Sequence, residues 1–178
     1  MFRKLLNNEL ERLDTEAFKA AEKVPAAIVL DNIRSQHNIG SAFRTADAVR
    51  LEKIWLCGIC AVPPTPEMHK SALGAEFSVA WEYCEETLDA VRRLKAEGWT
   101  IVSVEQAEGS TMLQDFTPEK DKKYAFVFGN EVKGVSQEVV DASDICLEIP
   151  QFGTKHSLNV SVSIGIVLWG AKLFPRIP

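Results

Sequence analysis

Short apolar runs alternate with amphipathic stretches along most of the chain. Strands are predicted at short, mainly apolar runs over residues 26–30, 53–57, 99–104, 124–128 and 145–149, of which the run at 26–30 is continuous, with a further aromatic strand at 77–83. Helices are predicted where apolar positions recur every three or four residues, at residues 3–23, 38–49, 85–97, 136–142 and 158–174. Continuous apolar strands between helices are typical of a parallel sheet covered on both faces. The pattern therefore predicts an α/β fold with a mainly parallel sheet flanked by helices.

Length and composition indicate one soluble domain. The 178 residues, 46% of them hydrophobic, suffice for one full core. The most apolar segment, residues 158–174, is shorter than the ~20 residues that a bilayer requires and carries Asn159 and Lys172. Glu9 precedes any long apolar run, so the start of the chain does not read as a signal peptide. We therefore expect a cytoplasmic protein with no membrane association.

Three loops rich in small and polar residues follow or adjoin predicted strands. They cover residues 38–44, 129–134 and 149–163. Open parallel sheets bind ligands beyond the carboxyl ends of their strands, so three such loops predict one site. Glycine allows close approach of the backbone, and Ser157 or Asn159 can cap the last helix. The chain lacks both G-x-G-x-x-G and G-x-x-x-x-G-K-[ST], which disfavours dinucleotide and P-loop phosphate binding.

Together, the three loops resemble the motifs of the SpoU (TrmH-like) family of tRNA/rRNA ribose 2′-O-methyltransferases, in the SPOUT superfamily. The residues that carry the resemblance are Asn38-Ile39-Gly40 with Arg44, Phe128-Gly129-Asn130-Glu131 with Gly134, and Ile149-Pro150 with Gly153 and Ser157-Leu158-Asn159-Val160-Ser161. Residues 25–178 are accordingly expected to form the SpoU-type catalytic domain, and residues 1–24 an N-terminal helical extension. The resemblance also implies a C-terminal deep trefoil knot and a homodimer.

The activity implied by the resemblance is transfer of a methyl group from S-adenosylmethionine to a ribose 2′-hydroxyl, with tRNA favoured over rRNA and no metal required. By the same resemblance, the cofactor is held by groups at strand ends, which here are Val104, Glu105, Gly129, Ile149 and Leu158. The net charge of −5 means that RNA must be held by a local basic patch. Lys70, Lys133 and Lys155 are candidates for phosphate contacts. His37 and His156 each fall in a motif loop, where they are expected to be solvent-exposed histidines, with RNA contact as the alternative.

Arg44 matches the catalytic position of the family. Its guanidinium, with a pKa above ~12, is a poor general base, so we expect it to stabilise a developing alkoxide or to grip the adjacent phosphate. Asn38 is expected to orient Arg44 or the ribose, and Glu131 to fix its loop by accepting hydrogen bonds. Ser157 and Asn159 are expected to contact substrate or cofactor.

Two alternatives remain open at this point. One is a non-catalytic RNA-binding or assembly protein on the same fold. The other is a thiol redox protein that uses the C-x-x-C formed by Cys57 and Cys60. The second alternative is weak because the motif has no second cysteine pair and no histidine at finger spacing.

Overall fold

The computed structural model describes residues 2–173, and its centre is one parallel sheet. The strands are β1 (Val24–Asp31), β2 (Leu51–Cys57), β3 (Trp81–Cys84), β4 (Trp99–Val104), β5 (Thr111–Met112), β6 (Lys123–Phe128) and β7 (Ile145–Glu148). Their order across the sheet is β3-β2-β1-β6-β4-β7-β5, and every described pair is parallel. The predicted α/β fold with a parallel sheet is confirmed.

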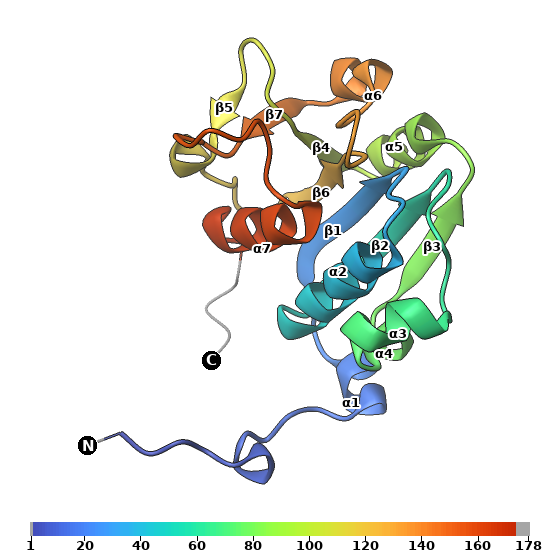
Figure 1. Ribbon diagram of the computed structural model, residues 1–178, viewed down its shortest axis with the longest axis vertical. Helices are drawn as coiled ribbons and strands as arrows, with labels where there is room; N and C mark the ends of the chain where they lie inside the picture. Colours follow the sequence, from blue (N-terminus) through green and yellow to red (C-terminus); the bar gives the residue numbers. More distant parts are fainter. Residues whose placement is uncertain (1, 174–178) are drawn as a thin grey trace.

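Helices cover both faces of the sheet (Figure 1). They are α1 (Thr15–Ala20), α2 (Gln36–Ala48), α3 (Pro66–Ala72), α4 (Ala75–Ser78), α5 (Thr87–Ala96), α6 (Gln137–Ala142) and α7 (Val160–Gly170), with short 3₁₀ turns η1 (Asn7–Glu9) and η2 (Leu113–Asp115). Side chains of α2, α3 and α7 share a core with Ile28 and Leu30 of β1. Side chains of α5 and α6 share a second core with Ala27 and Val29. This alternation follows from the two-residue repeat of a strand.

The strand order brings distant segments to one edge. β4 lies between β6 and β7, and its last residue, Val104, pairs with Phe128 of β6 and Leu147 of β7. The segments that follow these three strands therefore emerge side by side. Strand order does not describe how the chain is threaded, so the trefoil knot implied by the resemblance stays a prediction.

The helix predicted over residues 3–23 is wrong. Only η1 and α1 form there, and Figure 1 shows the segment before α1 stretching away from the sheet. Asp14 starts α1 by accepting the N–H of Ala17 at 2.8 Å. Leu5 and Leu6 remain exposed, so no packing supports a longer helix.

Smaller differences concern the ends of elements. The strand expected over residues 77–83 begins only at Trp81, because α4 occupies residues 75–78. The expected connection over residues 105–120 contains β5 and η2. The last helix begins at Val160 because the side chain of Asn159 caps it by accepting the N–H of Ser161. It ends at Gly170, and the last predicted helical residue, Phe174, lies outside the described residues. Within residues 2–173, no helix has the length and apolar character needed to cross a membrane.

Candidate active site

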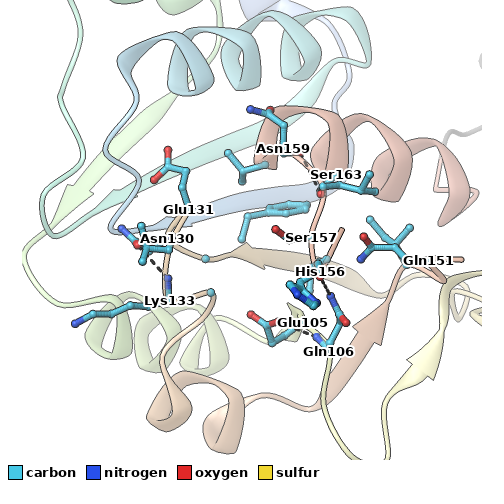
Figure 2. A pocket seen from close by; sticks show the side chains of 18 residues that line it. Glu105, Gln106, Asn130, Glu131, Lys133, Gln151, His156, Ser157, Asn159 and Ser163 are labelled. Carbon is cyan, nitrogen blue, oxygen red and sulfur yellow. Dashed lines mark hydrogen bonds between the residues drawn. The ribbon is translucent and has the colours of Figure 1, made fainter. Parts of the chain in front are cut away.

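A cavity of about 510 Å³ opens where β4, β6 and β7 end (Figure 2). The residues predicted to bind the cofactor all line it: Val104, Glu105, Gly129, Ile149 and Leu158. Three of the predicted catalytic residues, Glu131, Ser157 and Asn159, line it as well. The second and third motifs, about 20 residues apart in the chain, thus form opposite walls of one cavity.

The first wall is a tight loop over residues 129–135. Asn130 and Gly134 exchange two backbone hydrogen bonds, of 3.0 and 2.8 Å. The side-chain oxygen of Asn130 also accepts the N–H groups of Val132 and Lys133. A Cβ atom on Gly129 would lie 2.0 Å from the backbone of Gly134, so only glycine permits this closure.

Glu131 ties this wall to the start of α2. Its carboxylate accepts hydrogen bonds from the backbone N–H groups of Arg34 and Ser35, at 3.1 and 3.2 Å, and from Nδ2 of Asn38 at 3.1 Å. Burial raises the pKa of Glu131, but these hydrogen bonds outweigh burial and the net pKa is lowered. The carboxylate therefore stays ionised at neutral pH and acts as an acceptor.

Asn38 continues the connection to the second wall. Its Oδ1 accepts a hydrogen bond from Nδ2 of Asn159 at 3.2 Å. The Oδ1 atom of Asn159 in turn accepts the N–H of Ser161 at 2.9 Å and so caps α7. One hydrogen-bonded chain, Glu131–Asn38–Asn159, thereby joins the three sequence motifs.

Comparison with known proteins agrees with this geometry. Residues 25–169 match the model of the SpoU rRNA Methylase family. The chain belongs to that family.

Several relatives of this SpoU-family chain carry functional names. It is 31% identical over 173 residues to the tRNA (guanosine(18)-2′-O)-methyltransferase of Aquifex aeolicus, covering 94% of this chain and 77% of that protein. It is 31% identical over 144 residues to a 23S rRNA (guanosine-2′-O-)-methyltransferase of Neisseria meningitidis, covering 81% and 56%. Among solved structures, the AdoMet-bound rRNA methyltransferase of Sinorhizobium meliloti superimposes with a TM-score of 0.77 at 28% identity, covering 85% of this chain and 60% of that one. The chain spans less than two thirds of the length of several curated relatives.

Arg44, the remaining predicted catalytic residue, stands apart from the cavity. It lies on α2 six residues after Asn38, which is about 9 Å along the helix axis. Its side chain is exposed, does not line the cavity, and has no hydrogen-bond or ion-pair partner among residues 2–173. The structure thus joins Asn38, Glu131 and Asn159 directly and leaves the guanidinium of Arg44 facing solvent.

Only some of the residues predicted to contact RNA line the cavity. Lys133 and His156 line the cavity, whereas Lys155 does not. The carboxylate of Glu67 forms an ion pair with Nζ of Lys70 at 2.6 Å and lies 3.7 Å from Nε2 of His37. Its negative charge reduces the attraction of Lys70 and His37 for a phosphate.

Gln106 lines the cavity but lies outside the three predicted loops, whereas Gln151, Val160 and Ser163 line it from within the third loop without having been given individual roles. Gln106 donates a hydrogen bond from Nε2 to the carbonyl oxygen of His156 at 2.6 Å. Gln106 belongs to none of the three motifs, so no motif indicated it.

Cys57 and Cys60 are buried and lack the properties of reactive thiols. Burial raises the pKa of both, for Cys60 to about 11. The Sγ atom of Cys60 accepts the N–H of Ile33 at 3.2 Å and donates to the carbonyl of Leu30. Within residues 2–173, no three or more His, Cys, Asp or Glu side chains are grouped as metal ligands. The pair therefore has a structural role in the core.

Proposed function

We propose that this chain transfers a methyl group from S-adenosylmethionine to a ribose 2′-hydroxyl of a structured RNA. The observation that carries the proposal is the cavity whose walls are two family motifs and whose walls are joined by the Glu131–Asn38–Asn159 hydrogen-bonded chain. The names of the Aquifex and Neisseria relatives support the 2′-O position.

The cavity fits the cofactor in size and chemistry. Its volume of about 510 Å³ falls within the ~300–1,000 Å³ of most small-molecule sites. Val104, Ile149 and Leu158 offer apolar side chains for the adenine ring, while the backbone of residues 129–134 offers polar groups. The cofactor, when bound, supplies a methyl group activated by its sulfonium sulfur.

The protein must hold the ribose hydroxyl in line with that methyl group. Glu131 accepts a hydrogen bond from the amide of Asn38, and Asn38 accepts one from the amide of Asn159, so the orientation of both amides is fixed. Asn159 lines the cavity, and Asn38 lies next to it in this chain of hydrogen bonds. Arg44 would act from the RNA side, because its exposed guanidinium can bind a phosphate in bidentate fashion. It would then hold the RNA or stabilise the developing alkoxide.

A tRNA substrate is favoured over rRNA. The relative named for tRNA aligns over 94% of this chain and 77% of its own length, whereas the relative named for 23S rRNA aligns over 81% and 56%. The chain therefore shares more of its length with the tRNA-directed relative.

The protein is also proposed to form a homodimer through α7. This helix buries Val160, Ile164, Val167 and Leu168 in the core that it shares with α2. On another side it exposes Val162 and Ile166, to 50% and 37%. Ile166 borders an apolar hollow of about 290 Å³ lined also by Leu113, Ile149, Pro150 and Gly170. A helix that is apolar all round is usually buried, and a second copy of α7 would cover this side.

Sedimentation analysis tests the dimer. The wild type should sediment as a dimer, and Ile166→Asp should shift it toward the monomer. Ile59→Asp, at an exposed apolar position outside α7, should leave the mass unchanged. A wild-type monomer would contradict this part of the proposal.

Methyl transfer tests the reaction. Labelled S-adenosylmethionine is incubated with tRNA and, separately, with rRNA, and the RNA is digested to nucleosides. We expect labelled 2′-O-methylnucleoside from tRNA, abolished in Arg44→Ala and retained in Arg92→Ala, an exposed arginine of α5. Cofactor binding without transfer to either RNA would favour a non-catalytic RNA-binding protein. Label on a base would refute the 2′-O assignment.

A further inference from the structure

Glu105 and Gln106 lie between the two walls of the cavity. β4 sits between β6 and β7, so the residues that follow Val104 emerge between the two motif loops. Figure 2 shows Glu105 and Gln106 in this position, with Asn130 and Lys133 to one side and Gln151 to the other. Two consecutive side chains can therefore reach the two walls separately.

Glu105 holds the first wall. Its Oε2 accepts the N–H of Val135 at 2.9 Å, and its Oε1 accepts the N–H of Gln106 at 2.8 Å. A Cβ atom on Gly134 would lie only 2.1 Å from Oε2, so the loop passes directly against the carboxylate. The backbone N–H of Glu105 also donates to the carbonyl of Leu147 at 3.1 Å, which anchors the residue to β7.

Gln106 holds the second wall. Its Nε2 atom donates to the carbonyl oxygen of His156 at 2.6 Å, immediately before Ser157. The third motif between β7 and α7 has exposed side chains from residue 152 to residue 159, so it has little packing to define its position. The bond from Gln106 supplies a fixed point on the cavity side of this loop.

We propose that Glu105 and Gln106 act as a two-residue clamp that sets the separation of the cavity walls and thereby the affinity for the cofactor. They are positioning residues that act through the loops at Val135 and His156. The inference rests on the proposed function, since it concerns the same cavity. It changes the role of Glu105, which the sequence suggested only as a cofactor contact.

A direct electrostatic role for Glu105 makes a different prediction. S-adenosylmethionine carries a positive sulfonium, whereas its product, S-adenosylhomocysteine, has a neutral thioether. A carboxylate that attracted the sulfonium would matter for the first ligand only. A carboxylate that positions a wall must matter equally for both.

Calorimetric binding of both ligands to the full chain separates these roles. Glu105→Ala should weaken both by the same factor, about tenfold, the size expected for losing a hydrogen bond to a charged group. Glu105→Gln retains one carbonyl acceptor and should weaken both by only about threefold. Selective loss of S-adenosylmethionine binding in Glu105→Gln would overturn the clamp in favour of the electrostatic role.

Gln106 provides the second arm. Gln106→Ala loses the bond to His156, and Gln106→Glu places a carboxylate against the same carbonyl oxygen. Gln106→Glu should therefore bind both ligands more weakly than Gln106→Ala, and equal or better binding by Gln106→Glu would overturn the clamp. Glu108→Ala, at an exposed carboxylate of the same segment, should bind as the wild type does.

Two further measurements keep the test specific. The clamp predicts that the KM for S-adenosylmethionine rises with the dissociation constant. Loss of the two hydrogen bonds of Glu105 should lower the midpoint of thermal unfolding by about 3–6 °C, and a larger fall would indicate a general loss of folding. Wild-type binding without RNA methylation would refute the proposed reaction and leave the clamp measurable. A wild type that binds neither ligand would overturn both proposals.

Discussion

Replacing Glu131 tests whether one carboxylate organises the whole site. Glu131→Ala removes the acceptor of three hydrogen bonds, from Arg34 N–H, Ser35 N–H and Asn38 Nδ2. It thereby separates the loop over residues 129–135 from the first turn of α2. We therefore expect Glu131→Ala to lose both stability and catalytic rate.

The size of the stability loss follows from the three bonds. The site is partly exposed, so water replaces some of what is lost, and each bond counts for about 0.5–1 kcal/mol. Their sum is about 1.5–3 kcal/mol, which for a domain of this length lowers the midpoint of thermal unfolding by about 4–9 °C. Glu131→Gln keeps one carbonyl acceptor and should lose about half as much. Glu85→Ala, an exposed carboxylate with no hydrogen bond to residues 2–173, should change the midpoint by less than about 2 °C.

In Glu131→Ala, kcat for methyl transfer should fall by a larger factor than the affinity for the cofactor. Asn38 loses its fixed orientation, and misplacement of a positioning group by about 1 Å can cost up to about 10²-fold in rate. We therefore expect kcat for methyl transfer to fall at least about tenfold in Glu131→Ala. Equal midpoints and equal kcat in Glu131→Ala and Glu85→Ala would refute the role assigned to this carboxylate.

The pH dependence has a defined sign. Hydrogen bonds keep the pKa of Glu131 below its ordinary value of 4.5 despite burial, so the folded state favours the ionised form. Its contribution is therefore fully present above pH 4.5 and is lost as the pH falls through the lowered folded-state pKa. The stability difference between wild type and Glu131→Gln should be constant near neutral pH and should narrow below pH 4.5. A difference that widened on acidification would contradict this assignment.

Three further outcomes follow from the same structure. Asp31→Ala should lower the free energy of unfolding in urea by about 2–4 kcal/mol, because the buried carboxylate accepts the hydroxyl of Thr87 at 2.6 Å and a backbone N–H of the α6 cap. Gly129→Ala should abolish calorimetric binding of S-adenosylhomocysteine, since the added Cβ would lie 2.0 Å from the backbone of its own loop. A double Cys57→Ala, Cys60→Ala variant should keep its methyl-transfer rate per folded molecule, and loss of that rate would revive the redox alternative.

The elements that the sequence predicted well are those whose burial is uniform. The predicted strand over residues 26–30 lies within β1, where five consecutive apolar residues are all buried in the cores on the two faces of the sheet. The predicted helix over residues 3–23 failed for the opposite reason. Its apolar spacing is regular, but Leu5, Leu6 and Leu13 contact no core, and periodicity stabilises a helix only when its apolar face is packed.

In the candidate site, too, residues within a contiguous motif could be predicted, whereas roles that depend on the folded arrangement could not. The motif residues could be found because each motif is contiguous in the chain, and those predicted for the cofactor do line one cavity. Arg44 shares this local signal, yet the helical repeat turns it toward solvent, so its role depends on the RNA that would lie across α2.

Gln106 carried no such signal because its importance arises from strand order. The sequence of residues 99–106 does not indicate that β4 pairs with β6 on one side and with β7 on the other. Once that order is formed, the first two side chains after β4 necessarily stand between the loops that follow its neighbours. A polar pair at this point can hold both walls, whereas the same pair after an outer strand such as β3 could reach the loop of one neighbour only. In this fold, the residues that follow β4 are therefore the ones best placed to couple the second motif to the third.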